Sequence, residues 1–252
     1  MLRDNGSFNE TFGVLAMSMA GRNYWTGAGR LIVFILAASS IACLLFDFYG
    51  LCPMRIFTLY VFVPALLLLI AFAVVDRQHG NGQLWRGVAL GFFGGLLAAV
   101  AYDVFRLPFV FSKQWGLSSI MPPMDLFKVF PRFGAMILGQ PLEQAHYSTL
   151  TQVIGWLYHF SNGATFGVMY LALIGNPRRS WWWAVAMAVA LELGMLLTPY
   201  PSVFGIGITL RFVMVTVAAH AIFGVGLGQG VRQLANQYRA KTHNPALSEA
   251  PG

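Results

Sequence analysis

The sequence predicts an all-α integral membrane protein, a polytopic bundle of six transmembrane helices. Hydrophobic residues make up 57% of the 252 residues and charged residues only 10%, and the mean hydropathy is +0.64. This composition excludes an ordinary soluble domain. In addition, six apolar stretches are each long enough for a helix to cross a hydrocarbon layer of ~30 Å at ~1.5 Å per residue.

The six stretches cover, in chain order, residues 31–48, 56–75, 87–107, 152–174, 181–198 and a last stretch that ends near Val231. This last span has two possible first residues. A start at Gly205 would bury Arg211 in the bilayer, whereas a start at Arg211 leaves the guanidinium at the interface. We favour Arg211, because a central arginine is costly and the preceding residues are rich in proline and glycine. The transmembrane domain is therefore expected over residues 31–231.

The basic residues of the loops predict the orientation. An even number of spans puts both chain ends on one side, and that side carries ten basic residues: Arg3, Arg22, Arg30, Arg77, Arg86, Arg178, Arg179, Arg232, Arg239 and Lys241. The opposite side carries four: Arg55, Lys113, Lys128 and Arg132. Because basic loops stay in the cytoplasm, we expect a cell inner (plasma) membrane protein with both termini cytoplasmic. The net charge of +7 then reports orientation, and no nucleic-acid partner is expected.

Three segments lie outside the expected spans. In residues 1–30, apolar side chains recur at helical spacing over 8–19, which predicts an amphipathic helix lying on the cytoplasmic face or packed beneath the bundle. Residues 112–151 form a long outer loop whose apolar run, 133–138, is too short to span and predicts an interfacial or re-entrant lid. Residues 232–252 are expected to be a disordered cytoplasmic tail.

Glycines recur every four residues on three of the expected spans. They are Gly87, Gly91 and Gly95 on the third, Gly163 and Gly167 on the fourth, and Gly224 and Gly228 on the sixth. Small residues at this spacing let helix backbones approach closely in a bilayer. We therefore expect these glycines to build the bundle rather than to line a pore.

The fourth and sixth spans share a pattern of histidine followed by glycine four and eight residues later. His159 begins the pattern on the fourth span and His220 on the sixth. Each of these spans follows a span that carries one acid, Asp103 on the third and Glu192 on the fifth. This correspondence suggests that spans three and four are related to spans five and six as parallel repeats.

The few ionisable residues inside the spans define the candidate site, because such residues are costly in a bilayer and normally face the bundle interior. We expect a polar pocket in the outer half of the bundle, formed by His159, Asn162, Glu192 and His220. Its mouth would be shaped by Asp103, Arg106 and Arg211. Three chemistries fit this set: a polar pocket or proton relay, a haem or metal centre with His159 and His220 as ligands, and a purely structural network.

The leading functional hypothesis is a non-enzymatic protein that binds or moves a small molecule, ion or proton through this outward-facing pocket. The alternative is a haem- or metal-binding electron-transfer or accessory subunit of a membrane complex. A third possibility is an integral-membrane enzyme that acts on a lipid and uses the same acid and histidines as general acid and base. The expected partners are the lipid bilayer and either other membrane subunits or further copies of the chain.

Several activities are excluded by missing residues. The three lysines, Lys113, Lys128 and Lys241, all lie outside the expected spans, so no retinal Schiff base can form within the bundle. The chain has no H-E-x-x-H motif of metalloproteases and no G-x-x-x-x-G-K-[ST] phosphate loop.

Overall fold

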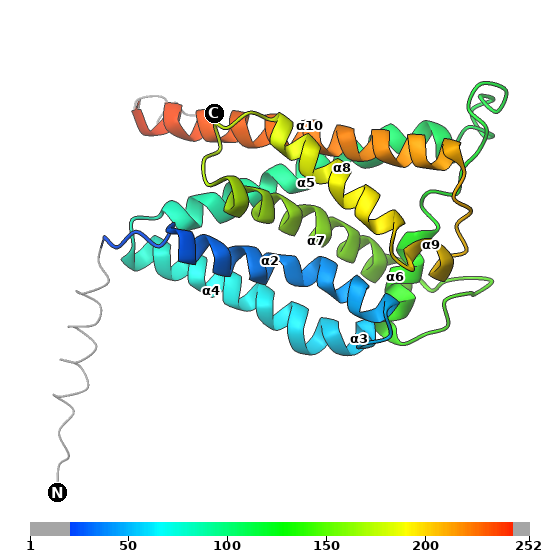
Figure 1. The fold of residues 1–252 in the computed structure, drawn as a ribbon, viewed down its shortest axis with the longest axis horizontal. Helices are drawn as coiled ribbons and strands as arrows, with labels where there is room; N and C mark the ends of the chain where they lie inside the picture. The colour runs from blue at the N-terminus through cyan, green and yellow to red at the C-terminus, as the bar shows by residue number, and fades with distance from the viewer. Residues whose placement is uncertain (1–20, 244–252) are drawn as a thin grey trace, which may run out of the picture.

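The computed structural model describes residues 21–243, with side chains up to residue 240, and within this range every regular element is helical. The elements are α2 (Gly27–Phe48), α3 (Met54–Phe57), the π turn η1 (Thr58–Phe62), α4 (Val63–His79), α5 (Gln83–Val110), α6 (Val129–Leu138), α7 (Thr149–Ile174), α8 (Trp182–Leu196), α9 (Tyr200–Val203) and α10 (Leu210–His243) (Figure 1). The prediction of an all-α fold is confirmed for the described residues.

Within residues 21–243, four helices are long and apolar enough to cross a membrane: α2, the continuous helix from Met54 to His79, α5 and α10. This part of the chain is therefore a helix bundle with four candidate membrane spans. The other two predicted spans correspond to α7, with 26 residues, and α8, with 15. These two helices do not reach the same combination of length and hydropathy.

Helix α7 lies at the centre of the bundle. It packs against α5, α2 and α6, and residues 163–172 are all buried. Helix α10 packs against α5 and α8, and α4 packs against α5 and α2. The α8–α10 pair thus forms one flank of the bundle and the α2–α4 pair the other (Figure 1).

The contact between α5 and α7 depends on glycines of both helices. A Cβ added to Gly95 would lie 2.1 Å from the carbonyl oxygen of Gly163, and one added to Gly167 would lie 2.0 Å from that of Gly91. No side chain other than hydrogen fits between these backbones. The glycines therefore hold the bundle together, as the sequence predicts.

The contact between α8 and α10 uses the corresponding face of α10. A Cβ added to Gly224 would lie 2.4 Å from the Cα of Val185, and one added to Gly228 would lie 2.7 Å from the Cβ of Trp181. The two glycines that follow the histidine therefore pack on α5 in the case of α7, and on the start of α8 in the case of α10. This equivalence agrees with the repeat suggested by the sequence.

Helix α10 begins at Leu210, which agrees with the predicted start at Arg211. It continues past Val231 to His243, so the prediction of disorder is wrong for residues 232–243. This segment contains no proline or glycine and has two residues each of Gln, Arg and Ala, which favour helix. Residues 244–252 of the expected tail lie outside the described residues. Most of the predicted N-terminal amphipathic helix, residues 1–20, lies outside them as well.

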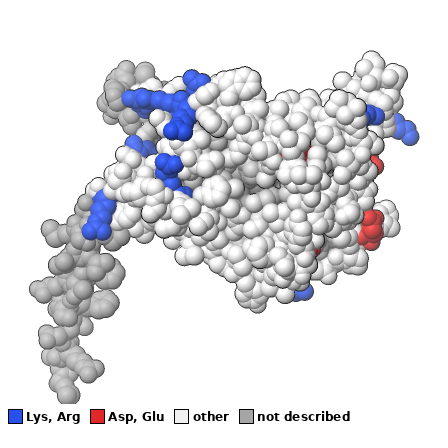
Figure 2. Space-filling view, viewed as in Figure 1, with Lys and Arg blue, Asp and Glu red and all other residues white. Residues whose placement is uncertain are grey.

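The two ends of the bundle differ in charge. The end that holds the last turns of α10, called the basic end below, carries most of the exposed lysine and arginine (Figure 2). The described basic residues of this end are Arg22, Arg30, Arg77, Arg86, Arg178, Arg179, Arg232 and Arg239. The opposite end, called the α6 end, holds α3, α6 and α9 and shows the acidic side chains visible in this view (Figures 1 and 2).

Candidate functional site

The first half of the candidate site is an ion pair between α5 and α7. The Nε2 atom of His159 on α7 lies 2.9 Å from Oδ2 of Asp103 on α5. Both side chains are largely buried, with 13% of each exposed. The carboxylate accepts the hydrogen bond and so fixes the orientation of the imidazole ring.

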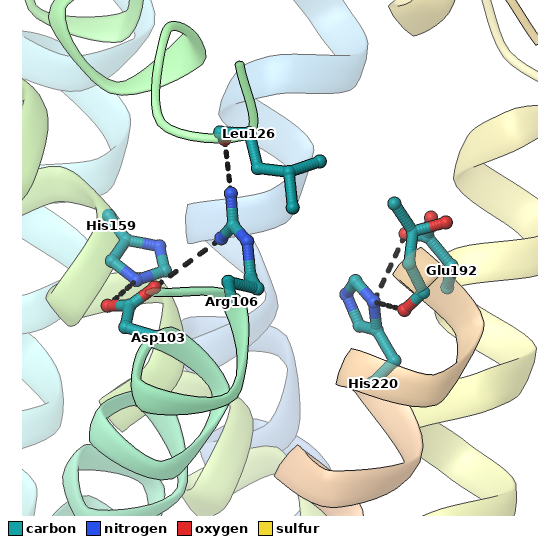
Figure 3. A network of polar contacts seen from close by, with 7 residues as sticks. Asp103, Arg106, Leu126, His159, Glu192 and His220 are labelled. Carbon is teal, nitrogen blue, oxygen red and sulfur yellow. Dashed lines mark hydrogen bonds and ion pairs between the residues drawn. The ribbon is translucent and has the colours of Figure 1, made fainter. Parts of the chain in front are cut away.

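Arg106 balances the charge of this pair. Its Nη1 lies 3.4 Å from Oδ1 of Asp103, and Nη2 donates a hydrogen bond to the carbonyl oxygen of Leu126 (Figure 3). The guanidinium carbon lies 4.6, 4.9 and 5.2 Å from the ring centroids of Tyr102, Phe127 and Phe130. Arg106 is only 4% exposed, so the aromatic rings and Asp103 take the place of water around its charge.

The second half of the site is an ion pair between α8 and α10. The Nδ1 atom of His220 donates to the carbonyl oxygen of Thr216 at 2.9 Å and lies 3.3 Å from Oε2 of Glu192. Glu192 is 6% exposed. Within the described chain its ion pair is with His220 alone, and no arginine takes part.

Tyr102 connects the two halves. Its ring centroid lies 6.0 Å from that of His159 and 4.9 Å from that of His220. The two histidines, which are 61 positions apart in the chain, therefore contact one aromatic ring from different helices. Figure 3 shows the two ion pairs facing each other, with Arg106 between them.

Both histidines line a cavity of about 360 Å³ at the α6 end. Its polar and charged lining residues are Tyr102, Arg106, Asp125, Lys128, His159, Asn162, Glu192, Tyr200, Thr209, Thr216 and His220. The remaining walls are mainly aliphatic and aromatic. The exposed lining residues Asp125, Lys128, Gly207 and Thr209 mark a mouth between the α6 segment and the chain before α10.

The structure brings together most of the predicted site residues. His159, Asn162, Glu192, His220 and Arg106 all line the cavity. The Oδ1 atom of Asn162 is buried and has no hydrogen-bond partner within the described chain. An amide oxygen in this state is available to a donor on a bound molecule.

Two of the residues predicted at the mouth have other positions. Asp103 does not line the cavity and instead holds His159 and Arg106 from the side of α5. Arg211 is not among the lining residues either, and its Nη2 donates to the carbonyl oxygen of Pro122. It therefore ties the start of α10 to the loop before α6.

Helix α6 covers one side of the cavity. A Cβ added to Gly155 of α7 would lie 1.8 Å from the carbonyl oxygen of Phe130, so the two helices are in close contact. Arg132 of α6 donates to the carbonyl oxygen of Phe204 at 2.6 Å and pairs with Glu143 at 2.5 Å. These bonds connect the α6 segment with α9 across the end of the bundle.

Sequence reasoning missed two tyrosines of the cavity. Tyr102 precedes Asp103 directly, but nothing in the sequence shows that its ring would reach both histidines. Tyr200 lies in α9, outside the expected spans, and burial raises the pKa of its hydroxyl, which therefore stays protonated. Only the distances between helices identify these two residues.

The geometry gives little support to a metal centre built from the two histidines. His159 directs Nε2 at Asp103, and His220 directs Nδ1 at Thr216 and Glu192. The described residues contain no group of three or more histidines, cysteines or acids placed to hold one ion. The arrangement is instead that of two histidines, each held by a carboxylate, which can accept and release protons beside a bound molecule.

Comparison of the chain with protein-family models, with curated proteins and with solved structures finds no match.

Proposed function

We propose that the protein crosses the membrane six times, with α7 and α8 as the two additional spans and both termini in the cytoplasm. The segregation of arginine at the basic end supports this orientation, because basic loops are retained in the cytoplasm. The exposed Trp182 and Trp183 at the start of α8 suit the interfacial level of that side. The α6 end would then face outward, with α6 as a lid.

Within this topology, we propose that the protein binds a small molecule or ion in the cavity and exchanges protons with it through the two histidines. The observation that carries the proposal is the meeting of two histidine–carboxylate pairs, Asp103–His159 and Glu192–His220, at one cavity. The imidazole ring can bind a proton at one nitrogen and release one from the other, so each histidine can exchange a proton with a molecule held in the cavity.

Access to the cavity is one-sided in this conformation. Its lining ends at Ala99 on α5 and Phe166 on α7. Beyond these residues, toward the basic end, the backbones of α5 and α7 touch at Gly91 and Gly167. Translocation would therefore require these helices to separate, and this conformation would be the state of the proposed cycle that is open toward the α6 end.

The test uses the full chain in proteoliposomes that contain a pH-sensitive dye. Amino acids, organic acids, sugars and inorganic ions are added outside, and the internal pH is followed. We expect at least one solute to drive proton movement in the wild type. The variants His159→Ala and Glu192→Gln should lose this movement, because each removes one partner of an ion pair at the cavity.

One variant serves as the control for this test. His146→Ala removes the same functional group as His159→Ala from an exposed position that does not line the cavity, and it should behave as the wild type. Normal proton movement in both His159→Ala and Glu192→Gln would exclude the proposal, and so would an equal loss in His146→Ala.

The topology is tested separately by cysteine labelling. In a Cys43→Ala/Cys52→Ser background, cysteines introduced at the exposed positions Ser119 and Ser180 report on the α6 end and the basic end. In intact cells a membrane-impermeant maleimide should label S119C and leave S180C unmodified. Labelling of both positions, or of S180C alone, would contradict the orientation.

A further inference from the structure

A second cavity lies at the opposite end of the molecule. It is a cleft of about 250 Å³ between the start of α5, the loop after α7 and the last turns of α10. Three arginines line it, one from each of these segments: Arg86, Arg178 and Arg239. In the described part of the chain, no aspartate or glutamate lines it. The described lining of the cleft therefore carries positive charge and no negative charge, which favours an anionic ligand.

The arginine of α5 is held in position at the cleft. Its Nε donates to the carbonyl oxygen of Gly82 at 3.0 Å and its Nη2 to that of Asn81 at 3.1 Å. The guanidinium of Arg86 also lies 5.9 Å from the ring centroid of Tyr238 on α10. Arg178 is exposed and extends from the loop after α7. A bound anion would thus meet one fixed and one adaptable guanidinium.

The floor of the cleft is apolar. It includes Trp25, Leu90, Leu171 and Ala235. The Trp25 side chain is fixed there, because its Nε1 donates to the carbonyl oxygen of Gly175 at 3.0 Å and its ring covers Gly87 closely. An apolar floor with a cationic rim fits a molecule with both a phosphate and a hydrocarbon part better than it fits a free anion.

We propose that this cleft binds an anionic phospholipid, with the phosphate between Arg86 and Arg178 and the glycerol and upper acyl chain against the apolar floor. Basic pockets between membrane helices are suited to such headgroups. The exposed Trp182 and Trp183 at this end of the bundle place the cleft near the level of the lipid headgroups. This site is independent of the cavity at the α6 end and of any solute bound there.

The experiment measures the binding of a fluorescent phosphatidylglycerol to the detergent-purified full chain, beside a phosphatidylcholine with the same acyl chains. We expect phosphatidylglycerol to bind more tightly and added salt to weaken this preference. Arg178→Gln should raise the Kd about fivefold, the ratio that corresponds to about 1 kcal/mol per arginine. Arg86→Gln should raise it at least as much.

The neighbouring residue supplies a matched control. Arg179→Gln removes the same charge from an exposed position next in the chain, outside the lining of the cleft. It should change the Kd by less than about twofold. Arg77→Gln is the corresponding control for Arg86→Gln, because Arg77 belongs to the same end but packs on Trp85.

Three outcomes would overturn the proposal. Equal binding of the two lipids would show that the cleft does not recognise the headgroup charge. Equal increases of the Kd in Arg178→Gln and Arg179→Gln would show that the lipid binds to a diffuse basic surface and not to this cleft. Displacement of the lipid by inorganic phosphate, beyond the effect of chloride at the same ionic strength, would assign the cleft to a soluble phosphate. Because Arg178 is exposed, its replacement tests the site even if Arg86→Gln fails to fold.

Discussion

The α5–α7 and α8–α10 pairs share a histidine–acid contact and glycine packing, but they differ in the partners of the acid and in the source of the glycines. Each places a histidine of its second helix against an acid of its first, and each packs glycines of the second helix on the first. In the α5–α7 pair, glycines of both helices meet and Arg106 shares the carboxylate of Asp103. In the α8–α10 pair, glycines come from α10 alone and Glu192 pairs only with His220 among the described residues.

This difference separates a fixed half of the site from an adaptable one. Asp103 holds two partners, and Arg106 is further bound to Leu126 of the α6 segment. Glu192 faces one partner, whose own bond to Thr216 does not depend on the acid. We therefore expect changes in α5 and α7 to affect the stability of the fold, and changes in α8 and α10 to affect mainly the chemistry of the cavity.

The largest effect is expected from Asp103→Asn. This change leaves the buried guanidinium of Arg106 without its counter-charge, which should lower the free energy of unfolding by about 4 kcal/mol. Glu192→Gln removes a carboxylate that has one partner, and His220 keeps its bond to Thr216, so this change should cost about 1 kcal/mol. Unfolding in mixed micelles measures both values. Equal losses of stability in the two variants would contradict the proposal that Asp103, unlike Glu192, balances a buried arginine. Recovery of stability in the double variant Asp103→Asn/Arg106→Gln would support it.

A smaller effect is expected from replacing glycines between the helices. In Gly95→Ala the new methyl group would meet the carbonyl oxygen of Gly163, and the shift required of two backbones should cost about 3 kcal/mol. In Gly228→Ala the nearest atoms, Cβ and Cα of Trp181, would lie 2.7 and 2.8 Å away, so a smaller shift is required and the cost should be lower. Gly226→Ala is the control, because its nearest neighbour would lie 3.3 Å away. Thermal unfolding should show the largest loss of stability in Gly95→Ala and the smallest in Gly226→Ala. A different order would contradict the conclusion that α5 and α7 pack more tightly than α8 and α10.

The smallest effect on stability is expected from replacing Tyr102, whose ring lies between the two histidine–carboxylate pairs. Tyr102→Leu removes the cation–π contact with Arg106 and the ring contacts with both histidines, and should cost about 1 kcal/mol. Tyr102→Phe keeps the ring and should be close to neutral in stability. A double-mutant cycle between His159→Ala and His220→Ala, measured with and without Tyr102→Leu, reports whether the ring couples the two pairs. A coupling unchanged by Tyr102→Leu would exclude this role.

The sequence predicted the elements that depend on local composition. Each of the six apolar stretches corresponds to a helix, and the cost of burying Arg211 placed the start of α10 correctly. The matching spacing of His159 and His220 from their glycines suggested that the two helix pairs are equivalent. In the structure each histidine lies beside the acid of the preceding long segment, Asp103 or Glu192, a contact that the spacing alone did not predict.

Other parts of the site depend on distances that a sequence does not contain. The role of Tyr102 follows from the approach of α5, α7 and α10 to one point. Arg211 was expected at the mouth by its depth, but its side chain turns to the carbonyl of Pro122, since the loop before α6 offers a nearer acceptor. The sequence does not predict the helical continuation of α10 beyond Val231, because a polar segment that leads into a proline-containing tail is typical of disorder.

The length of α10 has a practical consequence for imaging this small protein. Its 34 residues extend about 50 Å, whereas the hydrocarbon layer is ~30 Å thick. As a membrane span, α10 would therefore extend past the hydrocarbon layer at the basic end, where its last turns line the arginine cleft, and its Gly224 and Gly228 pack against the start of α8. A soluble helical protein joined in register after Ala240 would inherit this orientation and act as a fiducial marker for electron cryomicroscopy.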